Sequence, residues 1–505
     1  MNRTKKFFFN TVTTATLQVV TMVCGFILPK VMLSIYGSEI NGLVSSITQF
    51  VSSLTIVEAG LSGAIVYSLY KPLAINDYMG INRIASAAKK FYYRTGYLFL
   101  GLVLGGALVY PLFIKTNLLS NFEIGILFLA LGANGFLEFF TLAKYRALLT
   151  ADQKTYVISL ASIVQVVLNC AIIMILSYLR VSIVIVRAVA IISILLRTII
   201  LWLYCKKTYK FLDFSVEPDN SALNKRWDAL YFQIIGIVHT SSPIMIATFF
   251  LSLADVSIYS IYYVVINGIN AVMSIFTSGL SAGFGDLLAR GEKENFKKAF
   301  QQFEYMYYIL MTIVYATMVV TYIPFIHVYT YGADMNYIYP VFAVLITING
   351  YFYNLKTPYG MLTIAAGKFK ESRVQITIQA ILQVVLGIGL SQIWGLNGII
   401  IGSLISNLYR DIDFIFFAPK HLIDFGFKDS LMMWLRSILL VLITSLVAKS
   451  IPVGFITGYF SWALYALSVF IVVMVIVVFV NFLINPQQIH ACLDRIFGLF
   501  GKRGR

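Results

Sequence analysis

Long apolar runs separated by short polar segments recur along the whole chain. Each run is about 20 residues or longer, the length that an α-helix needs to cross the hydrocarbon core of a bilayer. The pattern predicts fourteen membrane-spanning helices, at residues 7–29, 40–67, 91–113, 118–143, 156–178, 181–204, 229–251, 256–285, 305–329, 337–366, 374–393, 396–417, 432–450 and 453–484. The first run has no cleavage signal of small residues, so it is interpreted as a retained span rather than a signal peptide. The expected fold class is therefore an all-α polytopic membrane protein.

The composition agrees with this pattern and excludes several classes of protein. Of the 505 residues, 59% are hydrophobic and only 12% are charged, against about 25% charged in a typical soluble domain. No polar segment is long enough for a soluble catalytic domain. The segment nearest to a nucleotide-binding loop, "AAGKFK" at 365–370, lacks the required glycine spacing and hydroxyl. The sequence thus predicts neither an enzyme nor a nucleotide-binding protein.

The net charge of +16 follows the predicted topology. With the N-terminus inside, nearly all lysines and arginines fall on the cytoplasmic side, whereas the outer loops hold Lys30, Lys115, Arg180 and Lys449. This asymmetry is the positive-inside rule, and it places both termini in the cytoplasm. The positive charge is therefore attributed to topology and contact with anionic lipid, and no nucleic-acid partner is expected.

Three short similarities, each separated by 214 to 219 residues, indicate an internal repeat. "GLSGA" at 60–64 is followed by "GLSAG" at 279–283, and "QVVLN" at 165–169 by "QVVLG" at 383–387. "YRALLTADQK" at 145–154 is similar to "YGMLTIAAGK" at 359–368. Because six spans separate the copies, both copies enter the membrane from the same side, which is a parallel repeat.

The repeat predicts two pseudo-symmetric six-helix lobes and two additional C-terminal helices. We expect an N-terminal lobe at residues 1–210, a cytoplasmic linker at 211–228 and a C-terminal lobe at 229–420. Spans 13 and 14 follow at 421–485, and a cytoplasmic interfacial tail follows at 486–505. The tail is predicted to lie on the membrane because its apolar residues share one helical face.

Among the ionisable residues within predicted spans, where a charge is costly and is by default a functional hypothesis, five are candidates for a site. Two are acidic, Glu58 and Glu138, and three are basic, Arg187, Arg197 and Lys356. The acidic pair are candidates for ion coupling and the basic residues for binding an anion. The alternatives are structural: the arginines can extend to the membrane surfaces, Glu58 can hydrogen-bond a neighbouring helix, and Glu138 can pair with Lys356.

Glycines also recur at helical spacing within the predicted spans. The segment "GIIIG" at 398–402 and the glycines of "GLSAG" allow close approach of two helices. We interpret them as packing positions rather than parts of a site.

The segment 36–73, "YGSEINGLVSSITQFVSSLTIVEAGLSGAIVYSLYKPL", resembles the start of bacterial polysaccharide flippases. These form the Wzx-type branch of the multidrug/oligosaccharidyl-lipid/polysaccharide (MOP) superfamily, which has a MurJ- and MATE-like fold. The matching positions are Tyr36, Gly37, Gly42, Leu43, Glu58, Gly60, Leu61 and Ala64. Segments 148–157, 365–370 and 395–406 resemble the same family, although glutamate stands at position 58 where aspartate is more familiar.

The resemblance implies a lipid-linked oligosaccharide flippase in the bacterial cell membrane. Its substrate would be an undecaprenyl-diphosphate-linked repeat unit, moved from the cytoplasmic to the outer leaflet by alternating access for synthesis of capsule, O-antigen or exopolysaccharide. Arginine suits phosphate oxygens, so Arg187, Arg197 and Lys356 are the expected diphosphate ligands. No cofactor is expected beyond a proton or sodium gradient, and the polymerase of the same assembly system is a candidate partner.

Two rival functions are weighed against the flippase. A drug or metabolite antiporter of the same superfamily would share the lobes but typically ends after twelve helices. A membrane enzyme of polysaccharide synthesis would need a large outer loop or a DxD-type motif, and the sequence shows neither. Which polymer is made, and whether protons or sodium ions drive transport, stay open on the sequence.

Overall fold

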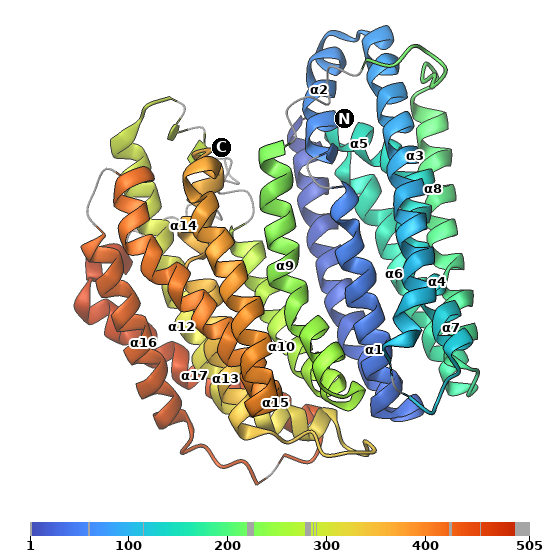
Figure 1. Ribbon diagram of the computed structural model, residues 1–505. Helices are drawn as coiled ribbons and strands as arrows, with labels where there is room; N and C mark the ends of the chain where they lie inside the picture. The colour runs from blue at the N-terminus through green and yellow to red at the C-terminus, as the bar shows by residue number, and fades with distance from the viewer. Residues whose placement is uncertain are drawn as a thin grey trace. The chain divides into compact units, whose positions relative to one another are not determined.

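The computed structural model describes residues 3–58, 61–114, 116–219, 227–277, 284–285, 287–288, 290–423, 427–454 and 456–489. All regular elements within these ranges are helical (Figure 1). The prediction of an all-α protein is therefore confirmed. The contacts divide the chain into two compact units, residues 1–264 and 265–505, and each is described by itself.

The first unit is built mainly from long helices joined by short turns. Its elements are α1 (Arg3–Leu54), η1 (Thr55–Glu58), α2 (Leu61–Ile75), α3 (Tyr78–Val109), η2 (Tyr110–Leu112), α4 (Asn121–Leu137), η3 (Glu138–Leu142), α5 (Ala143–Ala151), α6 (Thr155–Tyr178), α7 (Ile183–Ala190), α8 (Ile192–Thr208), α9 (Trp227–Phe250) and the first half of α10 (Leu253–Thr277).

Helix α1 is two helices that meet at Gly37, whose φ of 84° and ψ of 177° are not helical. The first half runs alongside α6, since Lys6 contacts Asp152 just before α6 and Tyr36 donates a hydrogen bond to Val181 just after it. The second half returns along α9. The chain therefore reverses direction at Gly37, a conformation that is essentially restricted to glycine.

The second unit contains the rest of α10 and seven further helices within the described residues. These are α12 (Lys293–Tyr329), α13 (Pro340–Leu355), α14 (Thr357–Ala365), α15 (Phe369–His421), α16 (Lys428–Ala448) and α17 (Tyr459–Ile484), where α15 is itself two helices that meet at Gly395. Helix α12 packs against α13, α16 and α17, and α13 packs against α15.

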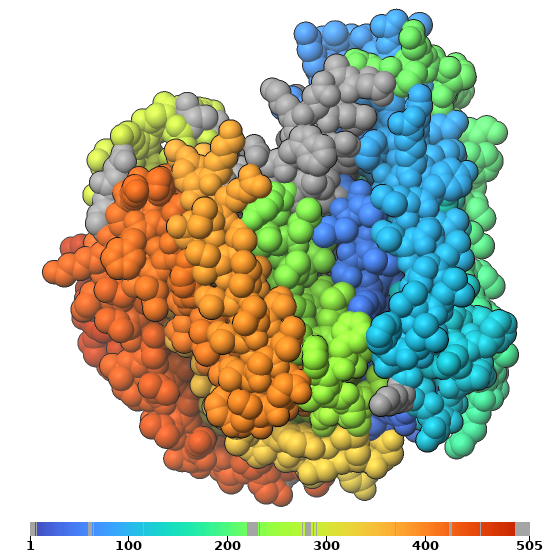
Figure 2. Space-filling view, viewed as in Figure 1, coloured from blue at the N-terminus to red at the C-terminus, as the bar shows by residue number. Residues whose placement is uncertain are grey.

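The space-filling view shows side chains of neighbouring helices in contact at the surface of each unit (Figure 2). In α17, Val469, Val473 and Val477 are spaced four residues apart and are buried against the stripe of α12 that includes Ala316. This spacing places one face of α17 against α12. The other faces of α17 are also apolar, as expected for a helix in contact with lipid.

Eleven helical segments of the described chain are long and apolar enough to cross a membrane. Two of them, 8–58 and 370–421, each contain two helices because the chain reverses at Gly37 and Gly395. The pair α13 and α14 together covers the predicted span 337–366. Each of the fourteen predicted spans thus falls on helical structure within the described ranges.

Several predicted span ends differ from the structure. Lys30, expected in an outer loop, lies inside α1, because the first helix continues until Gly37. The predicted span 40–67 is interrupted at η1, and the helix expected to end at residue 143 continues to Ala151. The predicted linker and interfacial tail include residues 220–226 and 490–505, which lie outside the described residues, so the predicted division into lobes stays a prediction.

Candidate functional site

The first unit holds a group of charged side chains built around Arg146. This arginine donates from Nη2 to Glu58 Oε1 at 2.5 Å and from Nη1 to Glu138 Oε1. The three side chains are 19–27% exposed. Two of the five predicted site residues, Glu58 and Glu138, are thus brought together by an arginine that sequence analysis assigned to a cytoplasmic loop.

A wide helical turn aligns Glu138 with Arg146. In a regular α-helix, residues eight positions apart are about 80° apart around the axis, since each residue turns about 100°. The segment Glu138–Leu142 is instead a π-helical turn. Such a turn accommodates about one extra residue, which leaves the two side chains about 20° apart. Wide turns of this kind are frequent at functional sites.

Glu58 lies at a second irregular segment. It is the last residue of the 3₁₀ turn Thr55–Glu58, which separates α1 from α2. Interruption of a helix in the middle of a predicted span leaves backbone groups that need other partners. The interruption also places the Glu58 carboxylate next to Arg146.

Arg197 joins this charged group from α8. It lies close enough to Glu138 and Arg146 to interact with both electrostatically, and its Nη1 donates to Gln165 Oε1 at 3.1 Å. Its Nε has no hydrogen-bond partner among the described residues. The group therefore contains two carboxylates and two arginines, and Arg197 retains an unused donor.

Arg187 does not belong to the same group. Its Nη2 lies 3.5 Å from the sulfur of Met32, and its Nε is also without a hydrogen-bond partner in the described part of the chain. Helix α7, which carries Arg187, ends before Ile191, and α8 carries Arg197. Ile191, between the two helices, keeps helical backbone angles, and residues 183–208 form one apolar candidate span. The two arginines therefore lie at two depths of one span, and each has an Nε without a hydrogen-bond partner among the described residues.

Lys356, the remaining predicted site residue, lies in the second unit between α13 and α14. Its Nζ donates to Asn407 Oδ1 at 2.7 Å, and it lies 5.1 Å from the centre of the Tyr353 ring. Gln379 donates to the same oxygen of Asn407, and Asn407 donates to Asn349. Lys356 is therefore part of a polar network that links α13 to both halves of α15.

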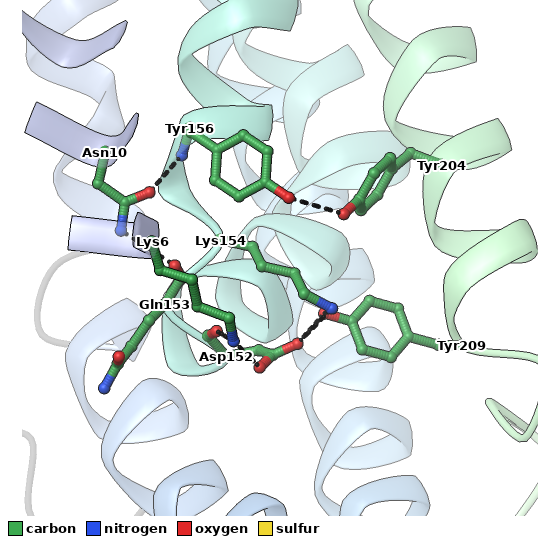
Figure 3. Close-up of polar contacts among 8 residues, drawn as sticks. All are labelled: Lys6, Asn10, Asp152, Gln153, Lys154, Tyr156, Tyr204 and Tyr209. Atoms are coloured by element: carbon green, nitrogen blue, oxygen red, sulfur yellow. Dashed lines mark hydrogen bonds and ion pairs between the residues drawn. The ribbon is translucent and has the colours of Figure 1, made fainter. Parts of the chain in front are cut away.

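A further ion-pair cluster joins the start of α1 to the turn before α6 (Figure 3). Asp152 accepts from Lys154 at 2.7 Å, from Tyr209 at 2.6 Å and from Lys6 at 3.1 Å. Burial acts to raise the pKa of Asp152, but these three hydrogen bonds outweigh it and hold that pKa below its usual value. Asn10 continues the same cluster by donating to the backbone carbonyl of Gln153.

The sequence contained a signal for some of the residues that were missed. Arg146 follows Glu138 by eight residues, but its polar neighbours suggested a loop rather than a continued helix. Asp411 lies in the segment "RDID" at 410–413, inside the predicted span 396–417. Glu304 lies one residue before the predicted span 305–329 and is completely buried, and its carboxylate accepts a hydrogen bond from Tyr359.

The helical arrangement and the charged groups within it define a multi-pass membrane protein with buried ion pairs. Neither family models nor curated proteins match the sequence. Among solved structures, the lipid II flippase MurJ in an inward closed conformation has the same fold, with a TM-score of 0.68 and 15% identity. The match covers 93% of this chain and 98% of MurJ.

Multidrug transporters have the same fold over a smaller part of the chain. An inward-facing MATE transporter of the MOP superfamily matches with a TM-score of 0.54 and 14% identity, covering 80% of this chain and 97% of the transporter. A MOP superfamily transporter from Pyrococcus furiosus matches with a TM-score of 0.51 and 17% identity, covering 81% and 94%. The predicted MurJ- and MATE-like fold is therefore confirmed.

Proposed function

We propose that this protein moves an undecaprenyl-diphosphate-linked oligosaccharide from the cytoplasmic to the outer leaflet of a bacterial cell membrane. The coverage of the structural matches carries the proposal. The MATE transporter is matched over nearly its whole length yet leaves about a fifth of this chain unmatched, whereas MurJ accounts for 93% of the chain. The match to the flippase thus extends over more of this chain than the match to the drug transporter does.

The unused arginine donors support an anionic substrate. Arg187 and Arg197 each have a buried Nε without a hydrogen-bond partner within the described ranges. A buried donor without a partner is costly, and a diphosphate would supply acceptor oxygens to the planar guanidinium. In this proposal Arg187 and Arg197 of the first unit bind the diphosphate, and Lys356 stays a separate candidate ligand.

The carboxylates of the same group are suited to couple transport to an ion gradient. Glu58 and Glu138 share Arg146, so a proton or sodium ion that neutralises one carboxylate frees one end of the guanidinium. A ligand shifts a conformational equilibrium only through its different affinities for the two states. Alternating access would follow if the carboxylates bind the ion more tightly in one state than in the other.

Purified protein in vesicles provides the test. The probe is a fluorescent undecaprenyl-diphosphate-linked oligosaccharide, whose position is read with a membrane-impermeant quencher under an imposed ion gradient. We expect the wild type to move the lipid and Arg197→Gln to move it at least tenfold more slowly, whereas the exposed Arg83→Gln retains the wild-type rate. Transport of a cationic dye without movement of the lipid would contradict the proposal and favour the drug antiporter.

A further inference from the structure

The two halves of α15 face each other with polar residues at every fourth position. Gln379 Nε2 donates to Asn407 Oδ1 at 3.2 Å, and Ser406 donates to the backbone carbonyl of Gln379 at 2.8 Å. These contacts show that the two halves run antiparallel, and they set which residues lie opposite one another. The polar positions in this register are Gln375 with Asp411, Gln379 with Asn407, and Gln383 with Ser403.

Asp411 is buried in this seam without the hydrogen bonds that a carboxylate normally makes. It is only 3% exposed, and neither of its oxygens has a hydrogen-bond partner among the described residues. The side-chain oxygen of Gln375, the residue opposite in register, is also without a partner there. Buried polar atoms are nearly always satisfied. In this register, three acceptor oxygens without a donor among the described residues lie opposite one another, an arrangement suited to hold a proton or a small cation.

In the part of the chain that the structure describes, the charged and titratable groups near Asp411 hydrogen-bond to other residues. The charged and titratable groups that interact electrostatically with Asp411 are Lys356, Arg410 and Tyr351. Arg410 donates to Asp413 and to Ser372, and the Tyr351 hydroxyl donates to Ser437. Lys356 donates to Asn407, which lies one helical turn, about 6 Å, from Asp411 along the same face.

We propose that Asp411 is a cation-exchange site, at which the carboxylate binds a proton or a sodium ion with the help of the Gln375 side-chain oxygen. The bound cation neutralises Asp411 and leaves Lys356 on Asn407. Release of the cation to water leaves a carboxylate that attracts the Lys356 ammonium group over one helical turn. The proposal rests on the proposed ion-coupled transport and adds to it a second coupling position, one that controls a residue expected to bind the diphosphate.

Infrared difference spectroscopy of the purified full-length protein tests the site directly, because a protonated carboxyl group has its own carbonyl stretching band. We expect acidification of the wild type to produce a band that is absent in Asp411→Asn. The matched control is Asp413→Asn, which removes the same charge two residues away on the same helix and should keep the band. Glu304 accepts hydrogen bonds from Tyr359 and Ser430 and is unchanged in all of these variants, so its signal should be common to them.

Sodium chloride, compared with choline chloride at the same pH, identifies the cation. Loss of the band with sodium alone shows that sodium shares the site, whereas an equal band in both salts assigns it to the proton. An acid-induced band in Asp411→Asn equal to that of the wild type would overturn the proposal. Should Asp411→Asn fail to fold, Asp411→Glu keeps a carboxylate and should shift the band and its pH midpoint, and an unchanged band would again reject the site.

The vesicle assay separates failure of the site from failure of the proposed function. If the band depends on Asp411 but the wild type moves no lipid, the site is retained and the flippase function is rejected. If the wild type moves lipid under a gradient and Asp411→Asn does so with the same gradient dependence, the function is retained and the coupling role of Asp411 is rejected.

Discussion

At the scale of single residues, the first unit depends on one arginine that satisfies two carboxylates. Arg146 is the shared partner of Glu58 and Glu138, and all three side chains are mostly buried. An ion pair of this kind is not in itself strong evidence for stability, because desolvation offsets the attraction. Removing one partner is nevertheless costly, since it leaves a buried charge without compensation.

Arg146→Gln should therefore destabilise the protein by about 3 kcal/mol. The control Arg83→Gln removes an exposed arginine and should change stability by less than about 0.5 kcal/mol. Thermal unfolding of both variants in detergent measures the difference. Adding Glu58→Gln to Arg146→Gln should recover part of the lost stability. Equal melting temperatures for Arg146→Gln and the wild type would show that the ion pairs of Arg146 contribute nothing to stability.

Asp152 gives the stability of the first unit a defined pH dependence. Its pKa is lower in the folded protein than in the unfolded chain, where it is about 3.9. The stabilisation is therefore complete above about pH 4 and is lost as the pH falls through the folded pKa. We expect Asp152→Asn to melt at a lower temperature than the wild type at pH 7. The difference between the two melting temperatures should become smaller in strong acid. A constant difference at every pH would contradict this assignment.

The sequence identified the charged residues that interrupt an apolar run but not those that lie close to its polar end. Glu58, Glu138 and Lys356 were found because each is surrounded by apolar residues. Arg146 was missed because continuation of a helix beyond residue 143 depends on packing against α2, α3 and α8, which a local pattern does not contain. Asp411 lies inside the predicted span 396–417 but is flanked by Arg410 and Asp413, so the local pattern did not single it out as an isolated buried charge.

At the scale of elements, irregular turns and close helix contacts position the polar groups. The π-helical turn Glu138–Leu142 and the 3₁₀ turn that ends at Glu58 could not be predicted from hydrophobic periodicity, because they change only the direction of side chains. The glycines at 398–402 were predicted correctly as packing positions. A methyl group on Gly402 would lie 2.6 Å from the backbone nitrogen of Gly387.

Gly402→Ala should push the two halves of α15 apart and weaken the contact between Gln379 and Asn407. We expect a loss of about 1–3 kcal/mol, as for other overpacked positions. Gly389→Ala is the matched control on the same pair of helices, because a methyl group there meets nothing within 4 Å. Similar melting temperatures for the two variants would mean that the helices separate without cost.

At the scale of the whole molecule, the predicted topology of fourteen spans with both termini in the cytoplasm can be measured. Reporters fused after Asn117 and Asn336 should lie on the outer side of the membrane, and a reporter fused after Glu217 should lie in the cytoplasm. These positions follow an odd and an even number of predicted spans, respectively, so an error of one span would reverse the result at every later site. Alkaline phosphatase and a fluorescent protein together report both sides of the membrane.

The reversal at Gly37 also has a consequence for biosynthesis. A single residue separates two long antiparallel helices there, so no loop is available to be carried across the membrane after the first helix has inserted. We expect the two helices to insert together as a hairpin and to pair with each other before they contact the rest of the chain. A tag inserted at Gly37 should therefore interrupt assembly at its first step.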